Sequence, residues 1–289
     1  MIRLTENPPV TTQFQIFTIF GDYILGKREG IWTSSLLTLM DQIGVSEKAI
    51  RATLSRMRRK GWIISQRDGR MSKYQLTAQG RALLERGQLR IFETVFSNWD
   101  QRWQLVIYSI PEEKRKLRET LRTQLAWLGY GQLAPGTWIS PHDRTSALDG
   151  LVAELNAKPY VDLFSGIYLG PSEEKELVER SWDLSSLGVQ YNAFITKHQG
   201  DYESLLSRSA NGEAAIVVED CFAQKFWLTH DFQSFPLADP NLPIELLPKD
   251  WIGTTARRLF DQYHQLLSKY VDGYVDEILS KPARTRQAV

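Results

Sequence analysis

The stretch TSSLLTLMDQIGVSEKAIRATLSRMRRKG, residues 33–61, decides the fold of the N-terminal part of the chain. Apolar residues recur at helical spacing up to Gly44, where glycine supplies the positive φ of a sharp turn. A second helical pattern begins after the capping residue Ser46 and ends at Gly61. Two short helices joined by such a turn predict a helix-turn-helix, with Thr33 as the N-cap of its first helix.

The second of these helices has two different faces. Ala49, Ile50, Leu54 and Met57 form an apolar stripe. The opposite face holds small residues and long cations, with Glu47 its only carboxylate: Lys48, Arg51, Ala52, Ser55, Arg58 and Arg59. Arginine bonds both acceptors of guanine, and small side chains let a helix approach base edges. A merely solvated face usually mixes both charge signs at i and i+4, so the pattern favours contact with DNA.

A predicted hairpin follows this helix directly. Its strands are Trp62–Gln66 and Met71–Leu76, and Asp68-Gly69 is a strong two-residue turn signal. A hairpin in this position predicts the wing of a winged helix-turn-helix, whose basic tip would contact the DNA backbone or a minor groove. The alternative is an ordinary surface hairpin with solvated arginines.

These patterns define a set of candidate contacts to a double-stranded DNA operator. We expect Arg51 and Ser55 to reach base edges. We expect Thr33 and Ser34 to donate to phosphate from the N-terminus of the first helix of the helix-turn-helix. The complete predicted DNA-binding set is Thr33, Ser34, Lys48, Arg51, Ser55, Arg56, Arg58, Arg59, Arg67, Arg70 and Lys73.

The charge of the chain is divided unevenly. Its 289 residues have a net charge of +1, but residues 1–92 hold fifteen cations against seven carboxylates, whereas the remainder holds twenty against twenty-seven. We call residues 1–92 the basic head and the remainder the acidic body. This division of charge predicts that only the head binds nucleic acid. The single cysteine excludes an internal disulfide and a Cys-based zinc site. No apolar run reaches membrane-spanning length and no signal peptide is apparent, which predicts a cytoplasmic protein without contact to membranes.

The rest of the chain predicts two further domains. Strands and helices alternate between residues 103 and 169 as in a ferredoxin-like sandwich, and helices dominate after residue 172. The predicted elements are helices Thr12–Leu25, 78–96 (capped by Thr77), Glu112–Leu128, Thr145–Ala157, Glu173–Gly188, Gln190–Arg208, Gly212–Phe232 and Thr254–Leu279, and strands Trp103–Ile110, Thr137–Ser140 and Val161–Leu169. The predicted fold class is α+β, with an N-terminal winged helix-turn-helix (1–97), a middle ferredoxin-like βαβ domain (98–172) and a mainly helical C-terminal domain (173–289).

Three stretches of the chain are distinctive: IRATLSRMRRKGWI (50–63), LAWLGYGQLAPGTWISP (125–141) and HDFQSFPLADPNLPIELLPKDWIG (230–253). In these stretches the chain resembles the PaaX-type repressors of phenylacetate degradation, and the likeness covers nearly the full length. The last stretch is the most specific, because prolines at such offsets seldom recur by chance. The resemblance implies a homodimeric repressor that binds operator DNA through its winged helix and is released by an aryl-acyl-CoA effector such as phenylacetyl-CoA.

Such an effector requires cations for its phosphates and an apolar slot for its acyl group. Candidate cations in the acidic body lie among many Trp and Tyr residues: Lys175, Arg180, Arg257 and Arg258. The sequence does not select a pocket among them. A DNA-tethered adaptor without any small effector remains an open alternative.

The middle segment VIYSIPEEKRKLRETL (106–121) is similar to small CRISPR-associated nucleases with a ferredoxin fold, which suggests a metal-dependent nuclease as the alternative function. Their metal site uses an aspartate at the end of the first strand, where this chain has Ser109, and a hydroxyl does not hold Mg²⁺ as a carboxylate does. Ser140, His142 and Asp143 are too close in sequence to form a triad, and Cys221 is predicted to be a buried structural thiol. The sequence therefore predicts no enzyme, no cofactor and no metal site.

Overall fold

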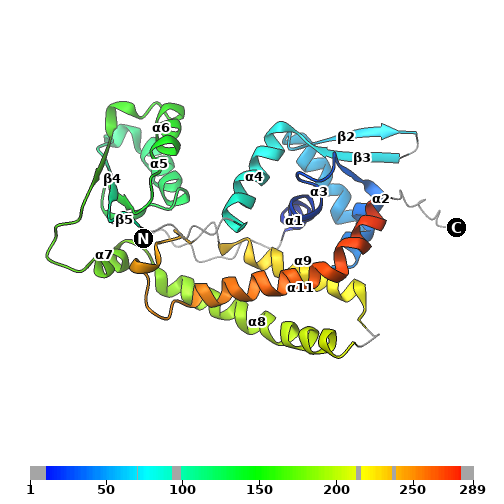
Figure 1. Ribbon diagram of the computed structural model, residues 1–289. Helices are drawn as coiled ribbons and strands as arrows, with labels where there is room; N and C mark the ends of the chain where they lie inside the picture. Colours follow the sequence, from blue (N-terminus) through cyan, green and yellow to red (C-terminus); the bar gives the residue numbers. More distant parts are fainter. Residues whose placement is uncertain (1–10, 70, 93–98, 213–215, 236–238, 281–289) are drawn as a thin grey trace. The chain divides into compact units, whose positions relative to one another are not determined.

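The computed structural model describes residues 11–69, 71–92, 99–212, 216–235 and 239–280. The chain divides into two compact units (Figure 1). The first combines Met1–Glu93, Asn192–Ser234 and Thr254–Val289, and the second combines Thr94–Tyr191 and Phe235–Gly253. Each unit is assembled from segments far apart in the sequence, and the division at residues 97 and 172 stays a prediction. The α+β fold class is confirmed.

The first unit contains a winged helix. Its elements are α1 (Thr12–Tyr23), β1 (Ile31–Trp32), α2 (Thr33–Asp41), α3 (Glu47–Arg59), β2 (Ile63–Asp68), β3 (Met71–Leu76) and α4 (Ala78–Phe92). The sheet has the antiparallel order β1-β3-β2. Gly44 and Gly61 have positive φ, and the Ser46 hydroxyl accepts from the N–H of Ala49, as predicted. The N–H of Gly80 donates to Thr77 Oγ1, so Thr77 caps α4 as predicted.

Two local predictions are wrong. Thr33 is not an N-cap: Trp32 occupies that position, and Thr33 Oγ1 donates instead to the carbonyl of Ser72 at 2.9 Å, because β3 lies alongside. The hairpin turn begins one residue later than Asp68, because Asp68 still pairs with Met71. Gly69 has a φ of 59° and is followed by Arg70, which lies outside the described residues.

Helix α1 is the centre of the first unit. Ile16, Ile19 and Phe20 are fully buried, and the polar Gln15 and Thr18 are buried with them. The helix contacts α3, α4 and also α9 (Val218–Phe232), which is distant in sequence. Burial on all sides indicates a core helix.

The last helix, α11 (Ile252–Ser280), joins the winged helix in this unit. Ser35 Oγ in α2 donates to the carbonyl of Ile278 at 2.7 Å, and Gln42 Nε2 donates to the Tyr274 hydroxyl at 2.6 Å. Figure 1 shows the end of α11 beside α2. The C-terminal helices therefore belong to the same compact unit as the predicted DNA-binding head.

A buried polar cluster lies where α1, α9 and α11 meet. Lys225 Nζ, on an almost fully buried side chain, is 2.6 Å from Asp272 Oδ1 and 5.3 Å from the centroid of the Tyr23 ring. Asp22 Oδ2 and the Tyr23 hydroxyl are buried without a hydrogen-bond partner in the described part of the chain. Burial raises the pKa of Asp22 to about 6, an effect that Lys225 partly offsets.

The second unit contains an antiparallel sheet in the order β5-β6-β4-β7. Its elements are β4 (Trp103–Tyr108), η1 (Glu112–Lys114), α5 (Arg115–Trp127), β5 (Gly131–Ala134), β6 (Thr137–Ser140), α6 (Thr145–Glu154), η2 (Lys158–Tyr160) and β7 (Val161–Gly166). The core joins Val106 and Tyr108 of the sheet to Leu121, Leu125 and Leu148 of the helices. This order confirms the ferredoxin-like fold and adds strand β5, which the sequence analysis missed.

The helical segments begin and end at different residues than predicted. Trp182 has extended backbone, so the predicted helix over 173–188 is split into α7 (Glu174–Ser181) and α8 (Leu184–Ala210). The Asp183 carboxylate accepts from the N–H of Ser186 at 3.0 Å, which is N-cap chemistry for α8. In the Pro-rich segment the described part holds η3 (Ile244–Leu246).

Replacing Gly80 with alanine will destabilise the winged helix by about 1–3 kcal/mol, because the added Cβ would overlap the carbonyl group of Trp62. A Cβ on Gly200, also helical, would meet nothing within 4 Å. Gly200→Ala is the matched control and will stabilise the chain by up to about 1 kcal/mol. Urea unfolding of both variants measures the difference, and equal effects would contradict the packing described at Gly80.

Candidate nucleic-acid interface

Helix α3 buries one side and exposes the other. Ile50, Thr53, Leu54 and Met57 are at most 1% exposed. The exposed side carries the predicted DNA-facing residues: Lys48, Arg51, Ala52, Ser55, Arg56, Arg58 and Arg59. The cationic face therefore lies on the surface and takes no part in the core.

The cations of this face differ in their partners. Arg51 Nε donates to Glu47 Oε1 at 2.6 Å, one turn away, and both side chains are more than half exposed. Such an exposed pair is worth about 0–1 kcal/mol, so a phosphate or a base can replace it. Arg56 Nη2 donates to Thr53 Oγ1 at 2.7 Å, a contact that the sequence analysis did not anticipate. Lys48, Arg58 and Arg59 form no ion pair with any described residue.

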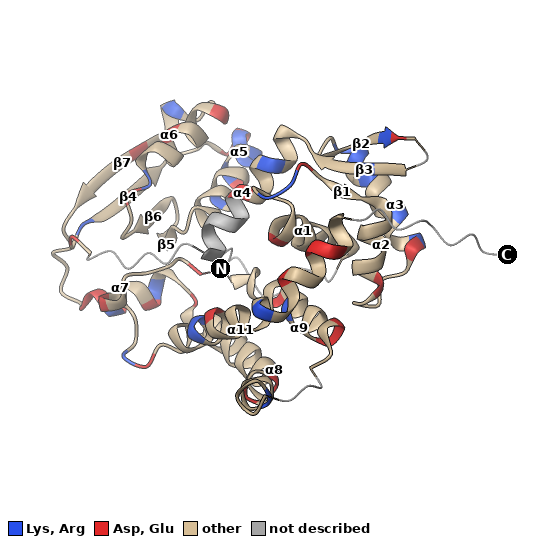
Figure 2. Ribbon diagram, turned by 45° about the vertical axis from the view of Figure 1, so that its right-hand side comes forward, with Lys and Arg blue, Asp and Glu red and all other residues tan. Residues whose placement is uncertain are grey.

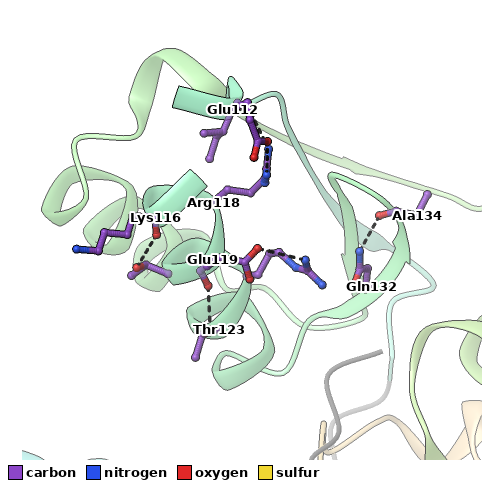
Figure 3. A network of polar contacts seen from close by, with 10 residues as sticks. Glu112, Lys116, Arg118, Glu119, Thr123, Gln132 and Ala134 are labelled. Carbon is purple, nitrogen blue, oxygen red and sulfur yellow. Dashed lines mark hydrogen bonds and ion pairs between the residues drawn. The ribbon is translucent and has the colours of Figure 1, made fainter. Parts of the chain in front are cut away.

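Helix α5 of the second unit shows how a solvated basic helix differs (Figure 3). Arg118 Nη2 is 2.6 Å from Glu112 Oε2, and Arg122 Nη1 is 3.7 Å from Glu119 Oε1. Carboxylates on the same chain segment thus neutralise these arginines. On α3, Glu47 is the single carboxylate and faces Arg51, so most of the positive charge there remains available.

The wing has an exposed cation near its tip. Arg67 is exposed on β2 and has no ion pair within the described ranges. Figure 2 shows basic and acidic positions next to each other at the end of β2. Lys73 is placed differently: its Nζ lies 3.3 Å from Glu29 Oε2 and 5.9 Å from the centroid of the Trp32 ring. The structure therefore brings Lys73 to the loop before β1, where it is held by a carboxylate that the sequence analysis did not consider.

The start of α2 carries the last two predicted contacts. Thr33 and Ser34 are half-buried at the first turn of this helix. The Thr33 hydroxyl donates its proton to the Ser72 carbonyl. The lone pairs of the Thr33 hydroxyl oxygen and the first backbone N–H groups of α2 are therefore left for an external partner. A contact to phosphate there would run through N–H groups and not through the Thr33 hydroxyl proton.

The candidate effector cations are divided between the two units. Lys175 and Arg180 lie on α7 in the second unit, whereas Arg257 and Arg258 lie on α11 in the first. Arg257 Nε bonds both carboxylate oxygens of Asp261, at 3.0 and 2.9 Å, and its guanidinium lies 5.8 Å from the Phe232 ring. A phosphate site at Arg257 would have to compete with this carboxylate.

Ser140, His142 and Asp143 do not assemble a catalytic triad. Ser140 Oγ accepts from the backbone N–H of His142 at 3.1 Å, and His142 Nε2 is paired with the Asn241 carbonyl at 2.7 Å. Asp143 Oδ1 accepts from Gln104 Nε2 at 2.8 Å. The three side chains therefore hold the β6–α6 loop in place.

Three further sequence predictions concern the thiol, the metal site and the membrane. Cys221 is buried as predicted, and burial raises its thiol pKa. Among the residues that the structure describes, no group of three or more His, Cys, Asp or Glu residues is arranged to hold a metal ion. Ser109 follows β4, and its N–H donates to the Tyr160 carbonyl at 3.0 Å. No helix in the described ranges combines the length and apolar character needed to cross a bilayer.

Comparisons with known proteins agree with this architecture. Residues 11–80 match the family model of PaaX-like proteins, residues 97–178 match the PaaX protein central Cas2-like domain, and residues 182–277 match the PaaX-like C-terminal domain. The transcriptional repressor PaaX of Escherichia coli (strain K12) is 30% identical over 272 residues, covering 93% of this chain and 84% of that protein. An uncharacterized protein from Mycobacterium tuberculosis has a similar fold, with a TM-score of 0.58 at 23% identity, over 91% of this chain and 98% of that one. The chain therefore belongs to the PaaX family, the family of this transcriptional repressor.

Proposed function

We propose that this protein is a sequence-specific DNA-binding transcriptional repressor. The observation that carries the proposal is the exposed face of α3, where Lys48, Arg58 and Arg59 have no ion-pair partner among the described residues. That face lies on the second helix of a helix-turn-helix, the element that enters the major groove in this motif. The name of the Escherichia coli relative, a transcriptional repressor, supports the same function.

Within this proposal the contacts have separate roles. Arg51 and Ser55 read base edges, and Lys48, Arg56, Arg58 and Arg59 bind phosphates. Arg67 brings the wing to the backbone, together with Arg70 and Lys73, and the start of α2 at Thr33 and Ser34 offers N–H groups to a further phosphate. A homodimer would read two half-sites about 34–36 Å apart, or a multiple of that distance, on a near-palindrome.

An aryl-acyl-CoA effector such as phenylacetyl-CoA is part of the proposal. It can release DNA only through different affinities for the DNA-competent and DNA-incompetent states. The C-terminal helix α11 contacts α2 through Ser35 and Gln42, so a ligand that moves α11 would also move the helix-turn-helix. Calorimetric titration with phenylacetyl-CoA tests this part: no heat and no release of bound DNA would remove this effector.

Selection of bound fragments from random duplex DNA tests the main proposal. We expect enrichment of a near-palindromic sequence, with affinity falling steeply as salt rises, because phosphate contacts release counterions. Repeating the selection with candidate CoA thioesters identifies the effector. A purified chain that ignores duplex DNA at low ionic strength would overturn the proposal.

A further inference from the structure

Helix α2 is held at both ends by the last turns of α11. At its first turn, Ser35 Oγ donates to the Ile278 carbonyl at 2.7 Å, and Ser35 is 1% exposed. At its C-cap, Gln42 Nε2 donates to the Tyr274 hydroxyl at 2.6 Å. These two hydrogen bonds, which we call the α2 clamp, are about 10 Å apart along the axis of α2, since each helical residue adds about 1.5 Å. Figure 1 shows this end of α11 beside α2.

Both bonds of the α2 clamp satisfy buried polar groups. Ile278 is among the last four residues of α11, whose carbonyl groups have no partner within the helix. The Ser35 hydroxyl therefore caps α11 from another helix. Gln42 Oε1 is buried without a hydrogen-bond partner in the described part of the chain, so the bond from Nε2 to Tyr274 orients this amide. Loss of either bond would leave a further polar group unsatisfied.

The end of α11 is itself firmly anchored. Val271 and Val275 are fully buried, so the apolar side of the helix reaches the core next to the clamp residues. Between them, Asp272 Oδ1 lies 2.6 Å from Nζ of Lys225, an almost fully buried side chain on α9. The residues that bond α2 therefore belong to a segment whose own position is fixed by packing and by an ion pair.

Apolar packing alone leaves the axial position of α2 less well determined. Leu36, Leu39 and Met40 are fully buried, but the hydrophobic effect is non-directional. Hydrogen bonds require a narrow range of distances and angles. Two of them at opposite ends of α2 therefore set its axial position and its rotation. Because α2 packs against α3 and joins it through the turn at Gly44, the same two bonds determine how α3 is presented to DNA.

We propose that Ser35, Gln42 and Tyr274 are positioning residues for DNA recognition, which hold α2 and α3 in the arrangement that reaches base edges. This inference rests on the proposed repressor and adds residues that act on DNA affinity through α2. Base-edge hydrogen bonds tolerate little displacement of α3, whereas cations on flexible stems can still follow a phosphate. Loss of the α2 clamp therefore lowers affinity for the operator more than affinity for unrelated DNA.

Two tyrosine-to-phenylalanine substitutions on α11 test the proposal. Tyr274→Phe removes the hydroxyl that accepts from Gln42 and keeps the ring. Tyr270→Phe, one turn earlier, is the matched control, because it removes a half-buried hydroxyl that donates to Ser209 Oγ of α8 at 2.8 Å. We expect Tyr274→Phe to lower operator affinity about three- to tenfold in fluorescence anisotropy, as for one lost hydrogen bond, with an unchanged salt slope. Tyr270→Phe will leave operator affinity unchanged.

Two further measurements distinguish positioning from a general loss of stability. Urea unfolding will show similar losses for Tyr274→Phe and Tyr270→Phe, whereas amide hydrogen exchange in α2 will be faster in Tyr274→Phe alone. Gln42→Leu combined with Tyr274→Phe will lose no more operator affinity than the weaker-binding single variant, because the two side chains form one bond. A folded Tyr274→Phe variant that binds the operator like the wild type, or an equal loss in Tyr270→Phe, overturns the positioning role.

The same experiments separate this inference from the proposed function. If the wild type binds the operator and Tyr274→Phe binds it equally well, the repressor stands and the positioning role falls. If the wild type ignores duplex DNA at low ionic strength, the repressor falls. Faster exchange in α2 of Tyr274→Phe alone would then keep the α2 clamp as a link that holds α2, and equal exchange in both variants would overturn it.

Discussion

Replacing Arg51 with alanine will lower affinity for the selected operator by about 5- to 150-fold, or roughly 1–3 kcal/mol. Arg51 lies on the exposed face of α3, and of its guanidinium nitrogens only Nε has a hydrogen bond to a described residue, at Glu47. The terminal nitrogens are therefore available for a bidentate contact to guanine. Fluorescence anisotropy with the operator, and with an operator altered at single base pairs, measures the loss and shows at which position discrimination is relaxed.

Two matched variants show whether the loss is specific to base reading. Arg58→Ala removes an unpaired cation on the same helix, and it will weaken binding to all sequences alike and reduce the salt slope by about 1. Arg122→Ala removes an arginine that Glu119 already neutralises on α5, and it will leave DNA affinity unchanged. If Arg51→Ala binds the operator like the wild type, the assignment of Arg51 to a base edge is wrong.

Asp22 will make the protein less stable as pH rises from about 4 to 7. Its pKa in the folded protein is raised from 3.8 to about 6, mainly by burial, so the folded state holds the proton more tightly than the unfolded state. The free energy of unfolding therefore falls through this window, by up to about 3 kcal/mol from this carboxyl group. Asp22→Asn keeps the shape of the side chain without the charge, and it will be more stable than the wild type at pH 7–8.

The difference between wild type and Asp22→Asn isolates this carboxyl group from its neighbours. Lys225, Lys27 and Asp272 act on the Asp22 pKa, and both proteins retain them. Burial lowers the pKa of His264 from 6.5 to about 4, and this stabilises the folded state as pH rises, in the opposite direction. Denaturant unfolding at several pH values measures the free energy of unfolding of the wild type and of Asp22→Asn as a function of pH. If the difference in the free energy of unfolding between the two proteins does not grow between pH 4 and pH 7, Asp22 does not have the raised pKa of a buried carboxyl group.

Local sequence signals predicted the winged helix well because its elements begin and end at residues with specific backbone chemistry. Ser46 and Thr77 cap their helices through side-chain oxygens, and Gly44 and Gly61 take positive φ values that few other residues adopt. The apolar stripe of α3 follows the helical period, so periodicity alone is enough to assign its buried and exposed faces. The candidate DNA-binding face is the side of α3 opposite that apolar stripe.

Local sequence signals did not predict the contacts between segments that are distant in the sequence. Strand β5 has four residues in a glycine-rich stretch, and its pairing with β6 gives it a strand conformation that its composition does not favour. The placement of Lys73 against Glu29 likewise depends on which segments pack together, and so does the burial of α1 on all sides.

The sequence by itself determined the helix-turn-helix, its cationic face and three of the four strands of the middle domain, because caps, turns and periodicity act over a few residues. Tertiary structure alone decided that α9 and α11 share a unit with the winged helix, and that the Oδ2 atom of Asp22 is buried where Lys225 acts on its pKa. The physical reason is that burial and the pKa of a buried group depend on residues far away in the chain, which no local pattern records.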